Sequence, residues 1–398
     1  MKVSPDQSTV PLARTAIKRA RAARRRRRAW VLLLALGLLV GVAVFGGIKV
    51  VRWLIGPPDF DGPGTGSVVV RVEDGATTSQ IARVLERSGV VASAQAFTEE
   101  ATAPEVEERV RAVQPGFYQM RARMSAESAV ELLLDPVSRV GRLEIRGGVQ
   151  LDDTSGADGS ITPGVLTLIS RATCLTVDGR ERCVPVEELR SAMAETDPAD
   201  LGVPEWALTD VRAADPVRRL EGLLVPGLYD IEPGTSAVEV LRGILDVSST
   251  RLEASGLVSG AEASGHSPYE VLVVASLVEK EGVTADMPKV ARVIYNRLDT
   301  GRRLELDSTV NYPLDRQALR TTPEDRARVG AYNSYAVAGL PPTPIAAPGR
   351  AAMAAALSPE EGPWLFFVRC QPDGVSCFAV SLAEHQANVR LAIENGAF

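Results

Sequence analysis

The stretch "SPYEVLVVASLVEKEG" at residues 267–282 decides how the second half of the chain is built. Ser267 and Glu270 form a capping box, and Pro268 takes the first helical position, so a helix is predicted to begin here. Apolar residues then point in nearly every direction around the helix, which indicates a helix at the centre of its domain. Gly282 predicts its end.

Two glutamates close this apolar helix, and Glu279 continues a stripe through Ala275 and Ser276, whose small side chains leave room for another segment. A carboxylate in the last turn meets the negative end of the helix dipole, at a cost of about 0.3–1 kcal/mol. Such a breach of a local rule is expected at functional sites. On spacing alone, Glu279 is either a catalytic acid or part of a solvated helix end. Lys280 and Glu281 leave the stripe and are expected at the surface or behind the site.

The N-terminal segment is strongly basic, unlike the rest of the chain. Residues 1–52 hold twelve Lys/Arg and one Asp, whereas the whole chain has a net charge of −6. The run "RAARRRRR" directly precedes "AWVLLLALGLLVGVAVFGGI" at 29–48, which has no charge and matches the apolar thickness of a bilayer. We expect a basic cytoplasmic tail at 1–28, an uncleaved transmembrane helix at 29–51 and an extracytoplasmic catalytic domain, which places the chain in the cell membrane.

Two other interpretations of the N-terminus are less favoured. A cleaved signal peptide would have a shorter apolar region followed by small residues, whereas Lys49 and Arg52 follow here. A nucleic-acid patch would not adjoin a membrane span and an acidic exported part, so no nucleic-acid partner is expected.

The remaining chain predicts an α+β fold in two parts. A Pro/Gly-rich linker at 52–67 leads into a small module at 68–140, where a β-branched strand, an Asp-Gly turn and short helices follow one another. A larger mixed α+β domain at 141–398 holds the central buried helix. Within it, residues 150–216 show the least regular pattern and are interpreted as a variable insertion.

The four cysteines fall into two local pairs. Cys174 and Cys183 bracket an Asp-Gly turn, and Cys370 and Cys377 bracket a Pro-Asp-Gly turn. Each pair spans a predicted hairpin, so two local disulfides are expected in an exported domain. Zinc is the alternative, but the spacing is not C-x-x-C and the chain has two histidines, so neither a metal nor a cofactor is expected.

Six stretches in a constant order resemble the MltG (YceG-like) endolytic murein transglycosylases. They are "LEGLLVPGLY" at 220–229, "ASLVEKEG" at 275–282, "VARVIYNRL" at 290–298, "LELDSTVNY" at 304–312, "YNSYAVAGLPPTPIAAPG" at 332–349 and the closing "EHQANV". The stretch "VEDGATTSQIA" is similar to the LysM-like module of that family. The chain departs from the family at Ser308, because the family usually has "DPTV" where this chain has "DSTV".

The resemblance implies a function and a site. Glu279 would be the catalytic residue, acting alone as acid and base on the bond between MurNAc and GlcNAc within peptidoglycan strands. The product would carry a 1,6-anhydroMurNAc end, and coupling to peptidoglycan synthases would end strand elongation. Candidate substrate-binding residues, chosen for their hydroxyl, amide or carboxylate groups, are Glu221, Asp307, Thr309, Asn311, Asn333 and Tyr335.

Other interpretations stay open beside this one. Asp307 could cap a turn, and Tyr335 could belong to the core. The chain could also be a non-catalytic envelope scaffold whose module binds peptidoglycan and whose larger domain recruits synthases. A protease is disfavoured because two histidines offer little material for a catalytic triad.

Overall fold

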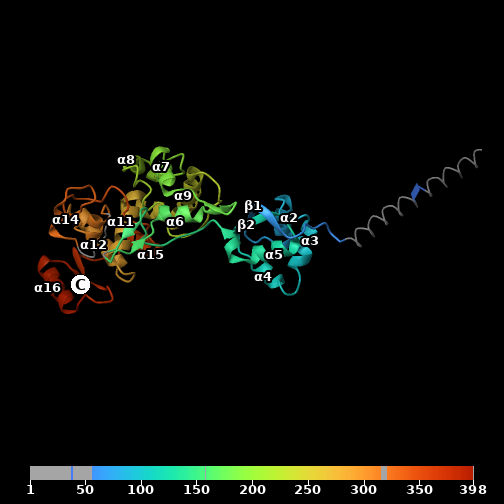
Figure 1. Ribbon diagram of the computed structural model, residues 1–398. Coiled ribbons are helices and arrows are strands. Elements are labelled where there is room, and N and C mark those ends of the chain that lie inside the picture. The colour runs from blue at the N-terminus through green and yellow to red at the C-terminus, as the bar shows by residue number, and fades with distance from the viewer. Residues whose placement is uncertain (1–36, 39–55, 157, 315–320, 398) are drawn as a thin grey trace, which may run out of the picture.

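The computed structural model describes residues 37–38, 56–156, 158–314 and 321–397. The expected tail at 1–28 and the expected transmembrane helix at 29–51 lie outside these ranges, apart from Gly37 and Leu38. Among the helices that the structure describes, none is both long and apolar enough to span a bilayer. A small N-terminal module and a larger C-terminal part are joined by a narrow connection (Figure 1).

The N-terminal module is built on a three-stranded antiparallel sheet in the order β1–β2–β3. Its elements are β1 (Pro63–Val72), α2 (Thr78–Arg87), α3 (Ala94–Ala101), α4 (Glu107–Arg111), β2 (Gly116–Met124), α5 (Ala126–Leu134), the 3₁₀ turn η1 (Pro136–Ser138) and β3 (Arg139–Val140). Thr77 caps α2 in a capping box with Gln80, and Ser125 caps α5. Leu85, Phe97 and their apolar neighbours form a core separate from that of the larger part.

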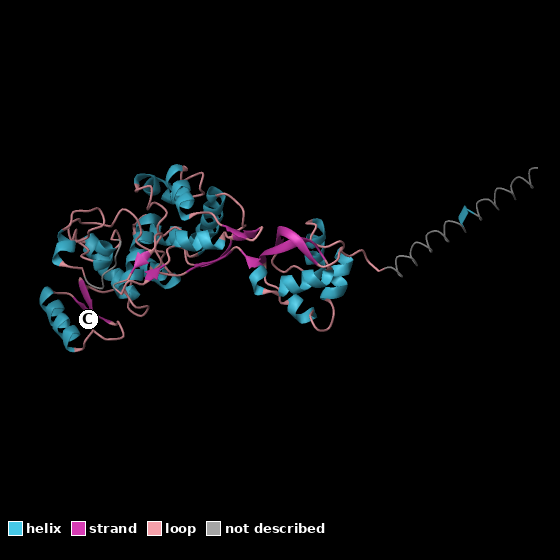
Figure 2. Ribbon diagram, viewed as in Figure 1, coloured by secondary structure: helices cyan, strands magenta, loops and turns pink. Residues whose placement is uncertain are grey.

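The larger part is mainly helical, and its described strands form short antiparallel pairs (Figure 2). The pairs are β4 (Arg142–Ile145) with β9 (Gly227–Asp230), β5 (Thr154–Ser155) with β6 (Ile161–Thr162), β7 (Leu175–Val177) with β8 (Arg180–Arg182), and β10 (Phe366–Arg369) with β11 (Ser376–Ala379). The helices are α6 (Val165–Ala172), α7 (Val186–Glu195), the 3₁₀ turn η2 (Glu205–Ala207), α8 (Leu208–Ala213), α9 (Ala237–Ala254), α10 (Leu257–Ser264), α11 (Pro268–Glu281), α12 (Met287–Asp299), α13 (Asp307–Asn311), α14 (Pro323–Ala327), α15 (Arg350–Leu357) and α16 (Leu382–Glu394). The mixed α+β class agrees with the expectation from sequence.

Helix α11 occupies the centre of the larger part, as its apolar pattern predicts. It packs against α10, α12, α13 and α15, and Leu272 and Leu277 are completely buried. Ser267 and Glu270 form the predicted capping box. Gly282 ends the helix with φ −109°, so it is not a left-handed terminator. A Cβ there would lie 3.3 Å from Val290 Cγ2, so glycine allows α12 to approach.

Residues 150–216, interpreted from sequence as a variable insertion, form part of the main core, and their variability stays a prediction. Helices α6, α7 and α8 bury Ile169, Met193 and Val211 in the same hydrophobic core as α11. The segment is hard to read in sequence because its helices are short and separated by loops, yet it supplies one side of the main core.

A single glycine joins the two parts of the molecule. Gly141 lies between β3 and β4 with φ +76°, and a Cβ there would lie 2.0 Å from the Ile231 carbonyl oxygen. A side chain is therefore excluded by both conformation and space. The Ile231 N–H donates a 2.7 Å hydrogen bond to Gly141 O, and Arg139 Nη2 lies 3.6 Å from Asp230 Oδ1 across the junction.

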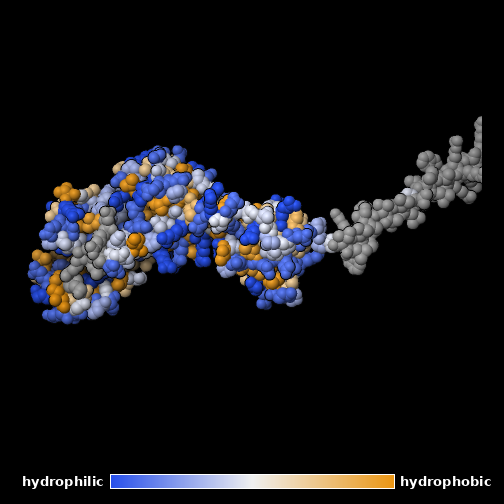
Figure 3. All heavy atoms as spheres, viewed as in Figure 1, coloured by the Kyte–Doolittle hydropathy of each residue, from blue (hydrophilic) through white to orange (hydrophobic). Residues whose placement is uncertain are grey.

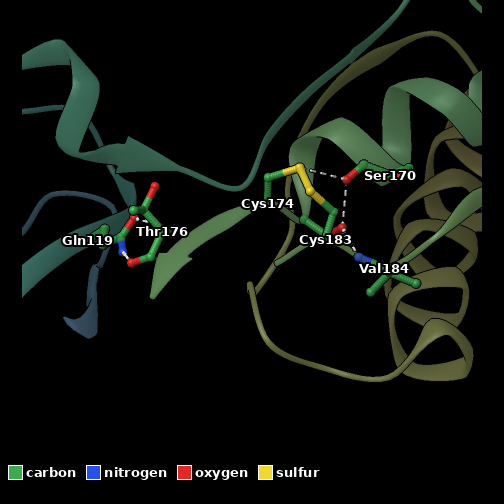
Figure 4. The surroundings of a disulfide bond; sticks show 7 residues. Gln119, Ser170, Cys174, Thr176, Cys183 and Val184 are labelled. Atoms are coloured by element: carbon green, nitrogen blue, oxygen red, sulfur yellow. Dashed lines mark hydrogen bonds between the residues drawn. A yellow bond between two sulfur atoms is a disulfide. The ribbon is translucent and has the colours of Figure 1, made fainter. Parts of the chain in front are cut away.

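Both disulfides have the expected pairing. Cys174–Cys183 closes the β7–β8 hairpin, which reaches back to the N-terminal module (Figure 4). There the Thr176 N–H donates to Gln119 Oε1, and the Thr176 carbonyl accepts from Gln119 Nε2. Cys370–Cys377 closes the β10–β11 hairpin.

Replacing both cysteines of either pair by serine should lower the Tm by several degrees and leave activity in place. A loop of this length contributes only about 2–3 kcal/mol through the unfolded chain, and each bond closes a local hairpin. Thermal unfolding of the two double variants checks this. Non-reducing peptide mapping of the purified protein checks the pairing, and a peptide that links the 174/183 region to the 370/377 region would contradict it.

Candidate active site

The Glu279 carboxyl group lies in the last turn of α11, partly exposed and enclosed by glycine backbone. The Gly349 N–H donates a 2.9 Å hydrogen bond to Glu279 Oε2. Gly349 is the N-cap of α15, so the positive end of that helix faces the carboxyl group and offsets the negative end of α11. A Cβ added at Gly147 would lie 2.7 Å from Glu279 Oε1, and one at Gly349 would lie 3.1 Å from Oε2.

Two segments far apart in sequence meet beside Glu279. The Gly148 N–H donates to Ala347 O at 2.9 Å, and the Ala347 N–H donates to Val149 O at 2.8 Å. The second segment is also fixed to α11, because the Ile345 N–H donates to Ser276 Oγ at 3.0 Å. The room left by the small side chains of α11 is therefore filled by the segment that leads into α15.

Lys280 and Glu281 are partly buried rather than fully at the surface. Lys280 Nζ donates to Gly148 O at 3.4 Å, and burial lowers the pKa of Lys280 against the opposing effect of nearby glutamates. Glu281 Oε1 accepts from Ser308 Oγ at 2.5 Å and from the Ser308 N–H at 3.3 Å. Burial raises the pKa of Glu281, and the Ser308 hydrogen bonds offset this only in part.

Asp307 and Tyr335, both predicted site residues, are in direct contact. The carboxylate of Asp307 accepts from the Tyr335 hydroxyl at 2.8 Å and from Thr321 Oγ1 at 2.6 Å, and it lies 3.2 Å from Arg326 Nη2. Burial raises the pKa of Asp307, but the hydrogen bonds and the Arg326 charge outweigh it, so its pKa lies below the usual value. Asp307 is thus an ionised carboxylate next to Ser308 and Glu281.

Glu221, another predicted site residue, is enclosed beneath the site. Its side chain is 1% exposed, and Oε2 accepts from the Leu151 N–H and the Tyr312 hydroxyl, each at 3.0 Å. Burial raises the pKa of Glu221 to about 7. The carboxyl group therefore ties the segment after β4 to the segment after α13.

The other predicted residues are buried in α13, which begins at Asp307, or lie two residues before Tyr335. Thr309 is fully buried and its Oγ1 lies 2.7 Å from Ser334 Oγ. Asn333 donates from its amide to the carbonyl oxygens of Arg326 and Arg328, and Asn311 is buried at the end of α13. Direct substrate contact by these residues stays a prediction.

A sequence profile of the YceG-like family matches residues 70–391, which is most of the chain. This chain belongs to the YceG-like family. The match confirms the resemblance carried by the six ordered stretches. It also reaches into the N-terminal module, although the LysM-like identity of that module stays a prediction.

Two curated relatives of this family member carry the name endolytic murein transglycosylase. The protein from Bacillus subtilis (strain 168) is 26% identical over 351 residues, which is 87% of this chain and 89% of that protein. The protein from Streptococcus pneumoniae serotype 2 (strain D39 / NCTC 7466) is 24% identical over 336 residues, which is 81% of this chain but 58% of that protein.

A solved structure supports the fold of this family member. The crystal structure of a YceG-like protein from Listeria monocytogenes matches with a TM-score of 0.52 and 24% identity, over 81% of this chain and 98% of that one. At this identity the likeness concerns the fold alone.

Several site residues were missed in the sequence. Gly147 and Gly349 carry no chemistry of their own, and their closeness to Glu279 depends on contacts across 132 and 70 residues, so nothing local announces it. Thr321 and Arg326 lie outside the six matching stretches. Two signals were available: Gly349 ends the matching stretch 332–349, and Ser308, which departs from the family pattern, binds Glu281.

Replacing Gly147 by alanine should reduce the activity proposed below by about 10- to 100-fold while changing stability little. The new Cβ would force the flexible Glu279 carboxyl group to move, because the two atoms would be 2.7 Å apart. Turnover and Tm of the purified variant check this. Gly243→Ala is the matched control, since a Cβ there meets nothing within 4 Å. Unchanged turnover in Gly147→Ala would show that the carboxyl position is not critical.

Proposed function

We propose that this protein is a membrane-anchored endolytic lytic transglycosylase of peptidoglycan. It cleaves the bond between MurNAc and GlcNAc within glycan strands and leaves a 1,6-anhydroMurNAc end. The observation that carries the proposal is the Glu279 carboxyl group, held at the end of a buried helix by the Gly349 N–H and left partly exposed. Two relatives named endolytic murein transglycosylase support the substrate class.

The proposed reaction uses one carboxyl group twice. Glu279 donates its proton to the glycosidic oxygen as the bond to MurNAc C1 breaks, which gives an oxocarbenium-like centre. The MurNAc C6 oxygen then forms a bond to C1, and its proton passes to the Glu279 carboxylate. The acid is thereby restored and no water is consumed.

The rest of the site supports this use of Glu279. The glycine backbone on either side lets a substrate come close to the carboxyl group. The Gly349 N–H and the N-terminus of α15 stabilise the carboxylate that remains after the first proton transfer. Asp307 and Tyr335, paired beside the contact of Ser308 with Glu281, offer polar groups for sugar hydroxyls.

Incubation of the purified protein with isolated sacculi tests the function. We expect mass spectrometry to find new 1,6-anhydroMurNAc ends inside long strands. Reducing ends in their place would mean hydrolysis. An absence of new ends would favour the alternative function, a non-catalytic scaffold.

We further propose that residues 29–51 anchor the chain, with residues 1–28 in the cytoplasm and the catalytic part outside. The charge-free run behind the arginines supports this. N-terminal sequencing of the protein from membranes tests it, and a mature N-terminus downstream of Phe45 would contradict it. In this position the enzyme would act beside peptidoglycan synthases and end strand elongation.

A further inference from the structure

We propose that an arginine-lined pocket of the N-terminal module binds a carboxylate group of the glycan strand while Glu279 acts on the same strand. The proposal rests on the proposed function, because it takes the glycan strand as substrate. The pocket has a volume of about 320 Å³ and lies at the junction with the larger part. Its polar lining residues are Arg109, Gln114, Tyr118, Asp135, Arg139 and Arg142.

The pocket has an excess of positive charge. Arg139 reaches Asp230 at 3.6 Å, and Asp135 Oδ1 accepts from the Val137 N–H. Arg109 and Arg142 form no ion pair with any residue in the described ranges. Like charges that share a pocket repel one another, so an anion that enters is attracted by the unbalanced arginines.

Arg139, which lines the pocket, is held by a hydrogen bond and by partial burial. Arg139 Nη2 donates to Pro115 O, whereas the buried Arg139 Nε has no hydrogen-bond acceptor among the described residues. A guanidinium group offers parallel N–H donors that fit the two oxygens of a carboxylate. The excess charge of the pocket therefore points to a carboxylate as the ligand.

Strand β4 connects this pocket to Glu279. It begins at Arg142, on the pocket wall, and two residues after its end Gly147 lies against the Glu279 carboxyl group. Five residues of extended chain span about 17 Å. Arg142 and Glu144 are exposed while Leu143 and Ile145 are buried, so one face of β4 is open along the path. A polymer that follows this face meets both sites.

Binding of soluble uncross-linked peptidoglycan strands to the full-length protein tests the proposal. The protein carries Glu279→Gln so that strands stay intact. Arg109→Gln/Arg142→Gln removes the two unpaired charges, and Arg83→Gln/Arg87→Gln on α2 is the matched control, equal in charge but outside the pocket. We expect about tenfold weaker binding for the pocket variant and little change for the control.

Changes to the strand test the same point without altering the protein. Native strands are compared with strands whose carboxylates are converted to methylamides, which should bind the unaltered pocket about tenfold more weakly. In native strands the lactyl carboxyl group is amide-bonded to the stem peptide. Strands stripped of their stem peptides therefore lose the peptide carboxylates and gain free lactyl carboxylates. An arginine effect that vanishes on stripped strands assigns the carboxylate to the peptide, and one that persists shows that the pocket also accepts the lactyl carboxylate that stripping exposes.

The proposal is overturned if the pocket variant and the unaltered pocket bind native strands equally well. It is also overturned if the unaltered pocket binds native and methylamidated strands equally well. This outcome is separate from a failure of the proposed function. The function fails if wild-type protein makes no anhydro ends from sacculi. The pocket fails if such ends form while the arginines and the carboxylates do not matter.

Discussion

Glu279→Gln should lower the formation of 1,6-anhydro ends by about 10³-fold or more, because one group supplies both the acid and the base. Glutamine keeps the size of the side chain and an oxygen that accepts from the Gly349 N–H. It cannot donate a proton to the glycosidic oxygen in the way a carboxylic acid does. Mass spectrometry of digested sacculi measures the effect, with Tm and strand binding expected to stay near wild type.

Glu281→Gln is the matched control for this prediction. The same change is made two residues later, where the side chain accepts from Ser308, and an amide oxygen can still accept that hydrogen bond. We therefore expect a milder loss than at Glu279. Near-wild-type turnover in a correctly folded Glu279→Gln protein would show that Glu279 is not the acid and base of the reaction.

The stability of the protein should fall as the pH rises from about 4.5 to about 7 because of Glu221. Burial raises the pKa of this carboxyl group from 4.5 to about 7 in the folded state. Between these values the folded protein holds a proton that the unfolded chain has released, so unfolding becomes more favourable with each rise in pH. The free energy of unfolding falls by roughly 3 kcal/mol through this effect, and the fall is complete above about pH 7.

Glu221→Gln should remove this part of the pH dependence, since an amide does not titrate. Urea unfolding of wild type and variant at several pH values from 5 to 8 measures the free energy of unfolding in each. The wild-type value should fall relative to the variant as pH rises. Parallel curves would show that Glu221 has an ordinary pKa in the folded protein.

Local features were predictable from the sequence where the cause lies within a few residues. The start of α11 follows from Ser267, Pro268 and Glu270, and its burial follows from apolar residues on every side. The two hairpins follow from turn residues between paired cysteines. In each case the determining contacts span about one turn of helix or one hairpin.

Features that depend on distant contacts were not predictable in this way. The site around Glu279 needs Gly147 from the segment after β4 and Gly349 from the start of α15. Asp307 was expected near the site, but its partners Thr321 and Arg326 follow only from the folded path of the chain. The place of residues 150–216 in the core was missed for a similar reason, because their short helices become core only when packed on α9 and on β4.

The link through Gly141 sets how the two parts of the molecule would share the proposed ligand. A flexible linker would let the module move freely around the larger part. Once one part had bound a ligand, the length of the linker would then set the effective concentration for binding by the other part. Here the ladder of β4 and β9 starts directly after Gly141, and the Ile231 N–H holds the Gly141 carbonyl. The connection is therefore stiff, and a polymer that contacts both parts gains avidity only when its repeat matches one fixed spacing.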